Sequence, residues 1–151
     1  MDASDTPRAE TPTLTVIRRV LLAILMVGML GTGVELVLLE HYESSSQFIP
    51  LVLLAMGLVV VVWHAGTGSR SSARGLRITM VLFLVAGIVG VALHYRGSLE
   101  FQMELDAAQH GWPLFMNVMR AKAPPALAPG VMAHLGLIGI AWAYRHPASR
   151  Q

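Results

Sequence analysis

The sequence predicts an all-α integral membrane protein in which four transmembrane helices form a bundle. Hydrophobic residues make up 54% of the 151 residues and charged residues only 13%, which is too little charge for a soluble domain of this size. The apolar residues also gather in four runs that carry almost no charge. Each run approaches the roughly 20 residues that a helix needs to cross a bilayer. A helix is also the form in which such a run satisfies its own backbone hydrogen bonds in lipid.

The four runs predict helices at about residues 16–41, 48–64, 76–95 and 126–145. Two arginines precede the first run, as they would in a signal peptide. The run is too long for a signal peptide and no small-residue cleavage site follows, so we expect an uncleaved anchor. The polar residues 1–13 are expected to form a disordered cytoplasmic tail, which leaves residues 14–151 as a single membrane domain.

The two longer connections differ in character. Residues 64–77 are basic and rich in glycine and serine, which predicts a flexible linker on the inner side. Residues 98–125 form an outer amphipathic loop, because apolar residues within it share one face of a short helix. We expect this loop to lie on the outer membrane surface or to cap the bundle.

The basic residues predict the orientation in the membrane. With the amino terminus inside, eight basic residues lie on the cytoplasmic side and three outside, which is a positive-inside bias. The inner ones are Arg8, Arg18, Arg19, Arg70, Arg74, Arg77, Arg145 and Arg150, and the outer ones are Arg96, Arg120 and Lys122. We therefore expect a multi-pass protein of the plasma (inner) membrane with both termini cytoplasmic. The pI near 9.5 follows from this asymmetry and gives no reason to expect nucleic acid as a partner.

Two segments of the chain resemble two later ones in the same order. HYESSSQF at residues 41–48 shares His, Tyr, Ser and Phe with HYRGSLEF at residues 94–101. Residues 50–63 likewise share Pro, Val, Gly, Leu and Trp with residues 129–142. This order predicts a tandem duplication of a helical hairpin, with the copies related by an axis along the membrane normal. The alternative is chance similarity between apolar segments.

Four ionisable side chains make up the candidate site: Glu35, His41, His94 and His134. Glu35 and His94 each continue a stripe of glycines along a helix, so we expect them to face the bundle. Glu35 and His134 are the strongly polar groups well inside the apolar runs, and counting from the helix ends predicts a similar depth for them. A charge there costs at least about 2.5–3.5 kcal/mol. In one interpretation, all four converge in an outward-facing site between the helices.

Several chemistries suit such a site. Histidine with carboxylate suits a divalent metal such as zinc or iron, and His41 with His94 suits the axial ligation of haem. Glu35 beside His134 suits a proton relay or a quinone-binding pair. The simpler alternative places His41 and His94 at the membrane surface as interfacial residues and joins Glu35 to His134 by one structural hydrogen bond.

Signatures of catalysis are missing from the sequence. There is no cysteine, which excludes disulfides, thiolate catalysis and cysteine-held metal. The serines next to His41 have no third group placed to orient that histidine. His64 and His146 end apolar runs on the inner side, where snorkelling at the interface explains them.

The expected function is that of a non-catalytic polytopic membrane protein without a cofactor. It would be an accessory or oligomer-forming subunit of a membrane complex. Its partners would be the lipid bilayer and other membrane proteins in a homo- or hetero-oligomer. The first alternative is the outward-facing metal, haem or quinone site. The second is a small transporter or a proton path through Glu35.

Overall fold

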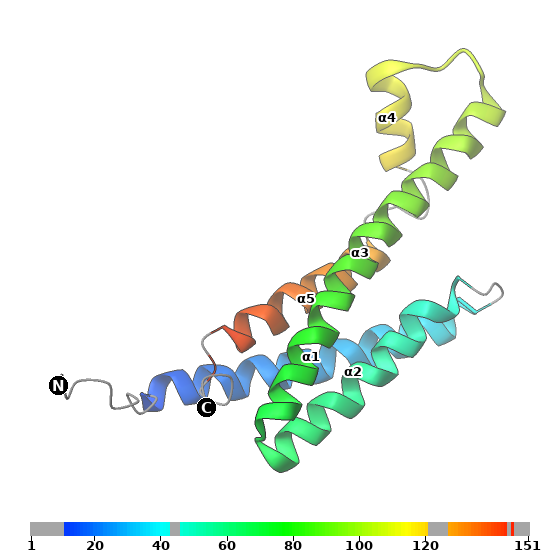
Figure 1. Cartoon of the computed structure of the whole chain (residues 1–151). Coiled ribbons are helices and arrows are strands. Elements are labelled where there is room, and N and C mark those ends of the chain that lie inside the picture. Colours follow the sequence, from blue (N-terminus) through cyan, green and yellow to red (C-terminus); the bar gives the residue numbers. More distant parts are fainter. Residues whose placement is uncertain (1–10, 43–45, 121–126, 145, 147–151) are drawn as a thin grey trace.

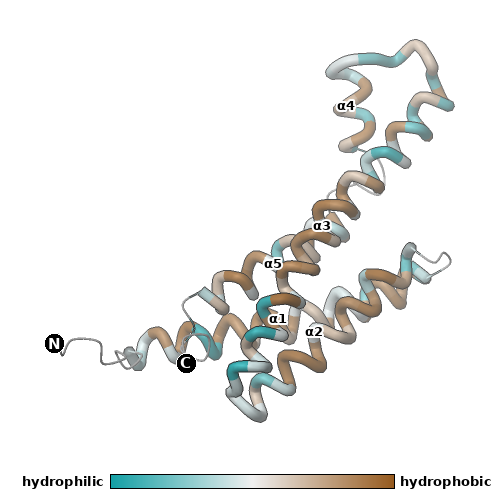
Figure 2. Tube along the Cα trace, viewed as in Figure 1, coloured by the Kyte–Doolittle hydropathy of each residue, from teal (hydrophilic) through white to brown (hydrophobic). Residues whose placement is uncertain are grey.

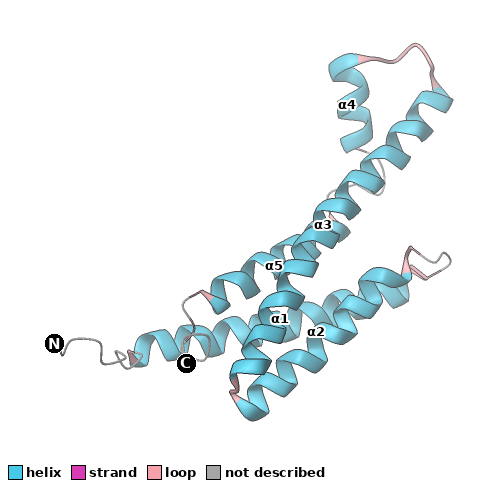
Figure 3. Cartoon of the chain, in the orientation of Figure 1, coloured by secondary structure: helices cyan, strands magenta, loops and turns pink. Residues whose placement is uncertain are grey.

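The computed structural model describes residues 11–42, 46–120, 127–144 and 146. Within these residues the chain forms helices and no strand, which confirms the all-α class (Figure 1, Figure 3). The helices are α1 (Pro12–Leu38), α2 (Phe48–Thr67), α3 (Arg70–Leu105), α4 (Gly111–Met119) and α5 (Ala128–Ala143). The tail predicted for residues 1–13 falls largely outside the described residues, and its last two residues already belong to α1.

Apolar residues dominate α1, α2, the middle of α3, and α5 (Figure 2). Three of the described helices, α1, α2 and α3, are long and apolar enough to cross a membrane, which identifies a membrane protein. α5 is also apolar but has 16 residues. At 1.5 Å per residue it spans about 24 Å, less than the roughly 30 Å of a hydrocarbon core.

The connection between α2 and α3 is a tight turn, so the predicted flexible linker is wrong. Gly68 ends α2 in the left-handed conformation with a φ of 54°, which glycine adopts without the steric cost of a Cβ atom. Ser69 then caps α3, because its side chain accepts a hydrogen bond from the backbone N–H of Ser72. Gly68 therefore ends α2 and Ser69 begins α3, so that these two residues form the whole connection.

α3 is much longer than the predicted helix at residues 76–95. It begins at Arg70, directly after the Ser69 cap, and continues to Leu105. The two ends of α3 are more polar than its middle (Figure 2). The apolar run in the sequence therefore predicted only the middle of the helix. An exposed ion pair between Arg96 and Glu100, 2.9 Å apart, supports the outer part of the helix.

The amphipathic helix predicted within residues 98–125 is α4. α4 packs against the outer end of α3 with Val118 fully buried. α4 and this end of α3 form a unit that stands apart from α1, α2 and α5 (Figure 1). α4 therefore packs part of its apolar face against α3 and does not cap the other helices, while Trp112 stays 70% exposed.

α1 ends at Leu38, three residues before the predicted end, because the chain reverses in a Schellman turn. The N–H of His41 donates to the carbonyl of Leu36 at 2.9 Å, and the N–H of Glu40 donates to that of Val37 at 3.1 Å. Glu40 has a φ of 52°, a left-handed conformation that costs a residue with a Cβ atom about 1–2 kcal/mol. This turn places His41 outside the helix.

The most extensive helix contact joins α3 to α5. Glycines allow the two backbones to approach closely. A Cβ atom on Gly136 would lie 2.6 Å from the backbone nitrogen of Leu84, and one on Gly87 would lie 2.8 Å from the Cα of Ala133. Small residues of this kind are typical of packed membrane helices, since they let van der Waals contacts form along the backbone.

The beginning of α1 is tied to the end of α5. The guanidinium of Arg18 is 7% exposed and donates to the backbone carbonyls of Trp142 and Tyr144. These carbonyls belong to the end of α5, where helical partners run out and the helix dipole attracts a cation. Further along, Gly28 packs against Leu135, so α1 and α5 run antiparallel. The start of α1 and the end of α5 therefore meet.

One hydrophobic core is shared by α1, α2, α3 and α5, while α2 and α5 each contact both α1 and α3. Its buried members are Leu25, Met29, Leu36, Leu54, Val61, Ala73, Leu76, Met80, Phe83, Met132, Leu135, Trp142 and Ala143. Large apolar side chains on the outer faces of these helices are exposed, as expected where lipid surrounds the protein.

Gly136→Ala is expected to destabilise the fold by roughly 1–3 kcal/mol, because the added Cβ atom pushes the α3 backbone away. Gly33→Ala is the matched control, since nothing lies within 4 Å of a Cβ atom there. It should be neutral or slightly stabilising through the higher helix propensity of alanine. Thermal unfolding in one detergent measures both. Equal losses in the two variants would contradict close packing of α3 on α5.

Candidate functional site

A cavity of about 550 Å³ opens between α1, α2, α3 and α5 at the end where α1 connects to α2. α1 contributes Thr32 and Leu36, and α2 contributes Ile49 and Pro50. α3 lines the cavity between residues 86 and 101, and α5 lines it with its first turns. The volume lies within the range of small-molecule binding sites in proteins.

The cavity changes from apolar to polar along its length. Its lining on α3 runs from Ala86 to Phe101, a distance of about 22 Å along the helix axis. The inner part is mostly apolar, with Ala86 and Met132, whereas the mouth carries His41, His94 and neighbouring Ser and Gln side chains. None of the described lining residues is Asp, Glu, Lys or Arg. As far as the described residues line it, the cavity therefore has a mostly apolar interior and a mouth with uncharged Ser and Gln side chains beside the two histidines.

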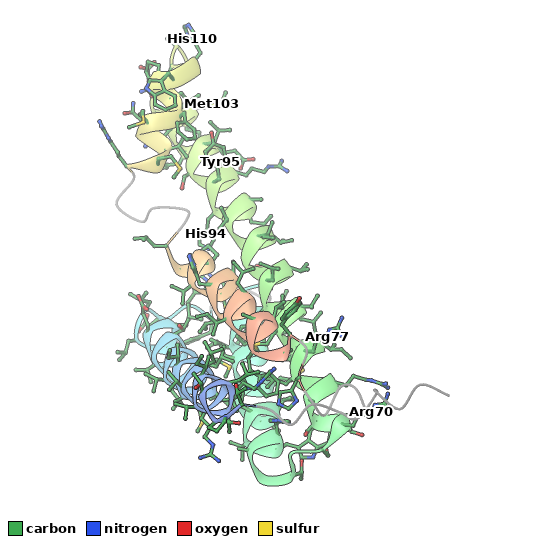
Figure 4. All side chains as sticks on the ribbon, turned by 90° about the vertical axis from the view of Figure 1, so that its left-hand side faces the viewer. Arg70, Arg77, His94, Tyr95, Met103 and His110 are labelled. Carbon is green, nitrogen blue, oxygen red and sulfur yellow. The ribbon has the colours of Figure 1, made fainter. Side chains whose placement is uncertain are left out.

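The mouth brings together two of the predicted site residues, His41 and His94. Their ring centroids are 5.9 Å apart and the ring planes are inclined by 21°. His94 projects from α3 at the level of the first turn of α5 (Figure 4). Burial, and then the charge of His94, lower the pKa of His41 below its ordinary value. His41 is therefore neutral at pH 7, and a neutral imidazole offers one donor and one acceptor.

Glu35 and His134 do not join this pair. Both are exposed, and Nδ1 of His134 donates to the carbonyl of Gly130 at 2.7 Å. Because α1 and α5 run antiparallel with Gly28 beside Leu135, Glu35 is level with the beginning of α5, about 10 Å from the level of His134. The two residues therefore lie at different depths, and the predicted convergence of all four is not seen. Glu35 is exposed, although it was expected to face the bundle.

A metal ion would need more ligands than the histidine pair supplies. Within the described ranges, no group of three His, Cys, Asp or Glu side chains lies close enough to hold a metal. Zinc sites usually take three or four protein ligands. For axial haem ligation, His41 and His94 stay the candidate residues, and that alternative stays a prediction.

A buried polar cluster at the opposite end was missed by the sequence analysis. His64 was expected to snorkel at the interface, but it is only 6% exposed. Its ring centroid lies 4.7 Å from that of Trp142 and 5.4 Å from that of His146. Nδ1 of His64 is also 2.9 Å from Oγ of Ser72. The Gly-Ser pair that makes the α2–α3 turn was the signal, because a tight turn brings these two side chains together.

The contact between His64 and Ser72 resembles the pairing of a base with a nucleophile, but its hydrogen bonds have the wrong direction. Ser72 is fully buried, and its hydroxyl donates to the carbonyl of Ser69 at 2.8 Å. When the hydroxyl donates to Ser69, its oxygen can only accept from His64. An activated nucleophile instead gives its proton to the base and is open to the substrate. The contact joins α2 to α3 as a structural hydrogen bond.

Comparison with known proteins adds no assignment to this geometry. No family model matches the chain, and neither a curated protein nor a solved structure matches it. The function of the cavity must therefore follow from its own shape and chemistry.

Acidification is expected to weaken the outer end of the fold through His41. Because burial and His94 lower the pKa of folded His41, the unfolded chain takes up this proton first as the pH falls. The contribution of neutral His41 is fully present above about pH 6.5 and is lost as the pH falls from there through the pKa of the folded state.

Melting temperatures between pH 7.5 and pH 5 measure this loss. His41→Gln should show a smaller decrease than the wild type, while His110→Gln, at an exposed position, should follow the wild type. If His41→Gln loses as much stability as the wild type over this range, His41 does not contribute in this way.

Proposed function

We propose that the chain is a non-catalytic polytopic membrane protein whose outer cavity binds an uncharged amphiphile of the quinone class. The observation that carries this proposal is the His41–His94 pair at the mouth of an apolar cavity. A quinone has an apolar tail and carbonyl oxygens that accept hydrogen bonds. Its tail would fill the space between Ala86 and Met132, and its head would meet the histidines.

The lining favours an uncharged head over an ionic one. A phosphate or carboxylate in the cavity would find no arginine or lysine among the described lining residues, and a buried charge without a partner is costly. Neutral His41 can donate one hydrogen bond and accept another, which suits both the carbonyl of a quinone and the hydroxyl of its reduced form. The polar side chains at the mouth would fix the orientation of the head.

We further propose that the protein acts as an accessory subunit that holds this molecule for a membrane complex. The outer face of α1 supports a contact with another chain, of the same or a different kind. Glu35 is exposed on this apolar helix and has no partner among the described residues. A neighbouring protein would relieve the cost of a carboxylate in lipid. A protein that purifies gently as a monomer without any partner would contradict this role.

The proposed topology has four membrane crossings, with both termini on the cytoplasmic side of the plasma (inner) membrane. α5 supports a fourth crossing, because its end meets Arg18 and its start is level with Glu35, so it covers nearly the depth of α1. Basic residues lie near this shared inner end. We also propose that the chain arose by duplication of a helical hairpin. His41 and His94 occupy equivalent positions in the two similar segments, and their rings lie side by side, which supports this origin.

The first test is the binding of a decyl-substituted benzoquinone to the purified full-length chain, measured by calorimetry in detergent. Ala86→Phe should weaken binding at least about 10-fold, because the larger ring fills the apolar interior. His41→Leu should weaken it about 3- to 10-fold through the loss of one hydrogen bond.

Val85→Phe is the matched control, because it makes the same kind of change at a neighbouring position that is 52% exposed. It should bind the quinone within about 2-fold of the wild type. If Ala86→Phe binds the quinone with the same affinity as the wild type, the quinone does not bind in this cavity. A Soret band in the absorption spectrum of gently purified protein would show that the bound group is haem and not a quinone.

The topology can be tested with single cysteines, because the chain has none of its own. Ala108→Cys lies in the exposed turn before α4, and Ser71→Cys lies in the exposed first turn of α3. A membrane-impermeant maleimide should label Ala108→Cys in intact cells and Ser71→Cys only after permeabilisation. Labelling of both positions in intact cells, or the reverse pattern, would contradict the proposed orientation.

A further inference from the structure

Within the described part of the chain, the wall of the cavity is open on the side between α2 and α3. Ile49 of α2 lines the cavity and is 55% exposed. On α3, Val89 and Leu93 also line it and are 50% and 59% exposed. Each of these side chains borders both the cavity and the surroundings of the protein, as residues at the edge of an opening do.

The three residues lie at one level of the two helices. A Cβ atom on Gly57 would lie 2.9 Å from the ring of Phe83, so α2 and α3 are in contact there. Because the two helices run antiparallel, eight residues towards the cavity lead from Gly57 to Ile49 on α2. On α3, eight residues from Phe83 lead to a point midway between Val89 and Leu93. The two edges of the opening therefore face each other.

The opening widens because α2 and α3 diverge from the turn that joins them. The helices are in contact at Gly57 and Phe83, and the cavity lies beside them at the level of Ile49. Figure 1 shows α3 leaning away from α2 as both leave the turn. On its other side α3 is covered by α5, where a Cβ atom on Gly90 would lie 2.7 Å from Pro129.

The opening faces the hydrocarbon of the membrane. Val89 and Leu93 belong to the uncharged run at residues 78–93 of α3, and Ile49 belongs to that at residues 48–63 of α2. Both helices are long and apolar enough to cross a membrane, and such runs then lie in the hydrocarbon. The cavity therefore meets the acyl chains of lipids through this opening.

The cavity alone has room for only a short tail. His94, at the mouth, lies eight residues from Ala86 in the apolar interior, a distance of about 12 Å along α3. The opening lies between these two levels. A tail longer than the interior can pass through it and stay in apolar surroundings, so that it avoids the cost of meeting water.

We propose that the cavity takes a long-chain membrane lipid whose tail leaves between α2 and α3 into the bilayer. This inference rests on the proposed function, and it narrows the quinone class to members with a tail longer than the cavity. The head is held at the mouth, while the tail contacts Ile49, Val89 and Leu93 on its way out.

Two benzoquinones test the proposal, one with a hexadecyl chain and one with a butyl chain short enough to stay inside. Their binding to the purified full-length chain is measured by calorimetry in one detergent. Val89→Trp should weaken the binding of the hexadecyl compound at least about 10-fold, because the indole ring fills the opening and the tail loses its apolar contacts. The butyl compound should bind within about 2-fold of the wild type.

Ile88→Trp is the matched control, because Ile88 is the next residue, is 59% exposed and does not line the cavity. It should bind both quinones within about 2-fold of the wild type. Ile49→Trp places the same ring on the α2 side of the opening and should repeat the effect of Val89→Trp, so the test does not depend on the folding of one variant.

Two results for the tryptophan variants at the opening would overturn the proposal. Equal weakening of the butyl and hexadecyl compounds would show that Ile49 and Val89 only shape the space for the head. Unchanged binding of both compounds would show that the tail leaves elsewhere. A wild-type chain that binds neither compound would instead contradict the proposed function itself, and this inference with it.

Discussion

The architecture depends on how closely the backbones of α3 and α5 approach each other. In lipid, apolar side chains gain little by leaving their surroundings, so helices associate through van der Waals contact. Gly87 and Gly136 remove side-chain volume where these two helices meet. Once α5 is held in this way, the bonds from Arg18 to its last carbonyls fix α1. α2 is then held between α1 and α3.

The two ends of the helix assembly differ as a result. The end at which α1 begins is closed, because Arg18 is buried there and His64 bonds to Ser72 across the α2–α3 turn. At the opposite end, α1 ends in the turn at Glu40. α3 extends beyond this turn and beyond the first residue of α5. The outer cavity lies at this end, and its mouth receives side chains from the loop after α1.

Hydropathy predicts the parts of the structure that lipid selects, and it misses the parts that local backbone chemistry or helix register determines. The apolar runs predict α1, α2, α5 and the middle of α3. The polar ends of α3 depend on the Ser69 cap and on the contact with α4, which hydropathy does not see. In the candidate site, the similarity between residues 41–48 and residues 94–101 identified both His41 and His94 from the sequence. It could not show that Glu35 and His134 lie at different depths, since no sequence pattern states the register of α1 against α5.

α3 is continuous from Arg70 to the contact with α4, a length of about 54 Å. In a helix of this length, a small rotation at one end becomes a large displacement at the other. A change of about 10° in its tilt would move the far end by about 9 Å. Any event that shifts α3 against α5 in the cavity would therefore be transmitted along α3 as a displacement of α4. In mechanical terms, α3 connects the packed core to α4 through one continuous helix.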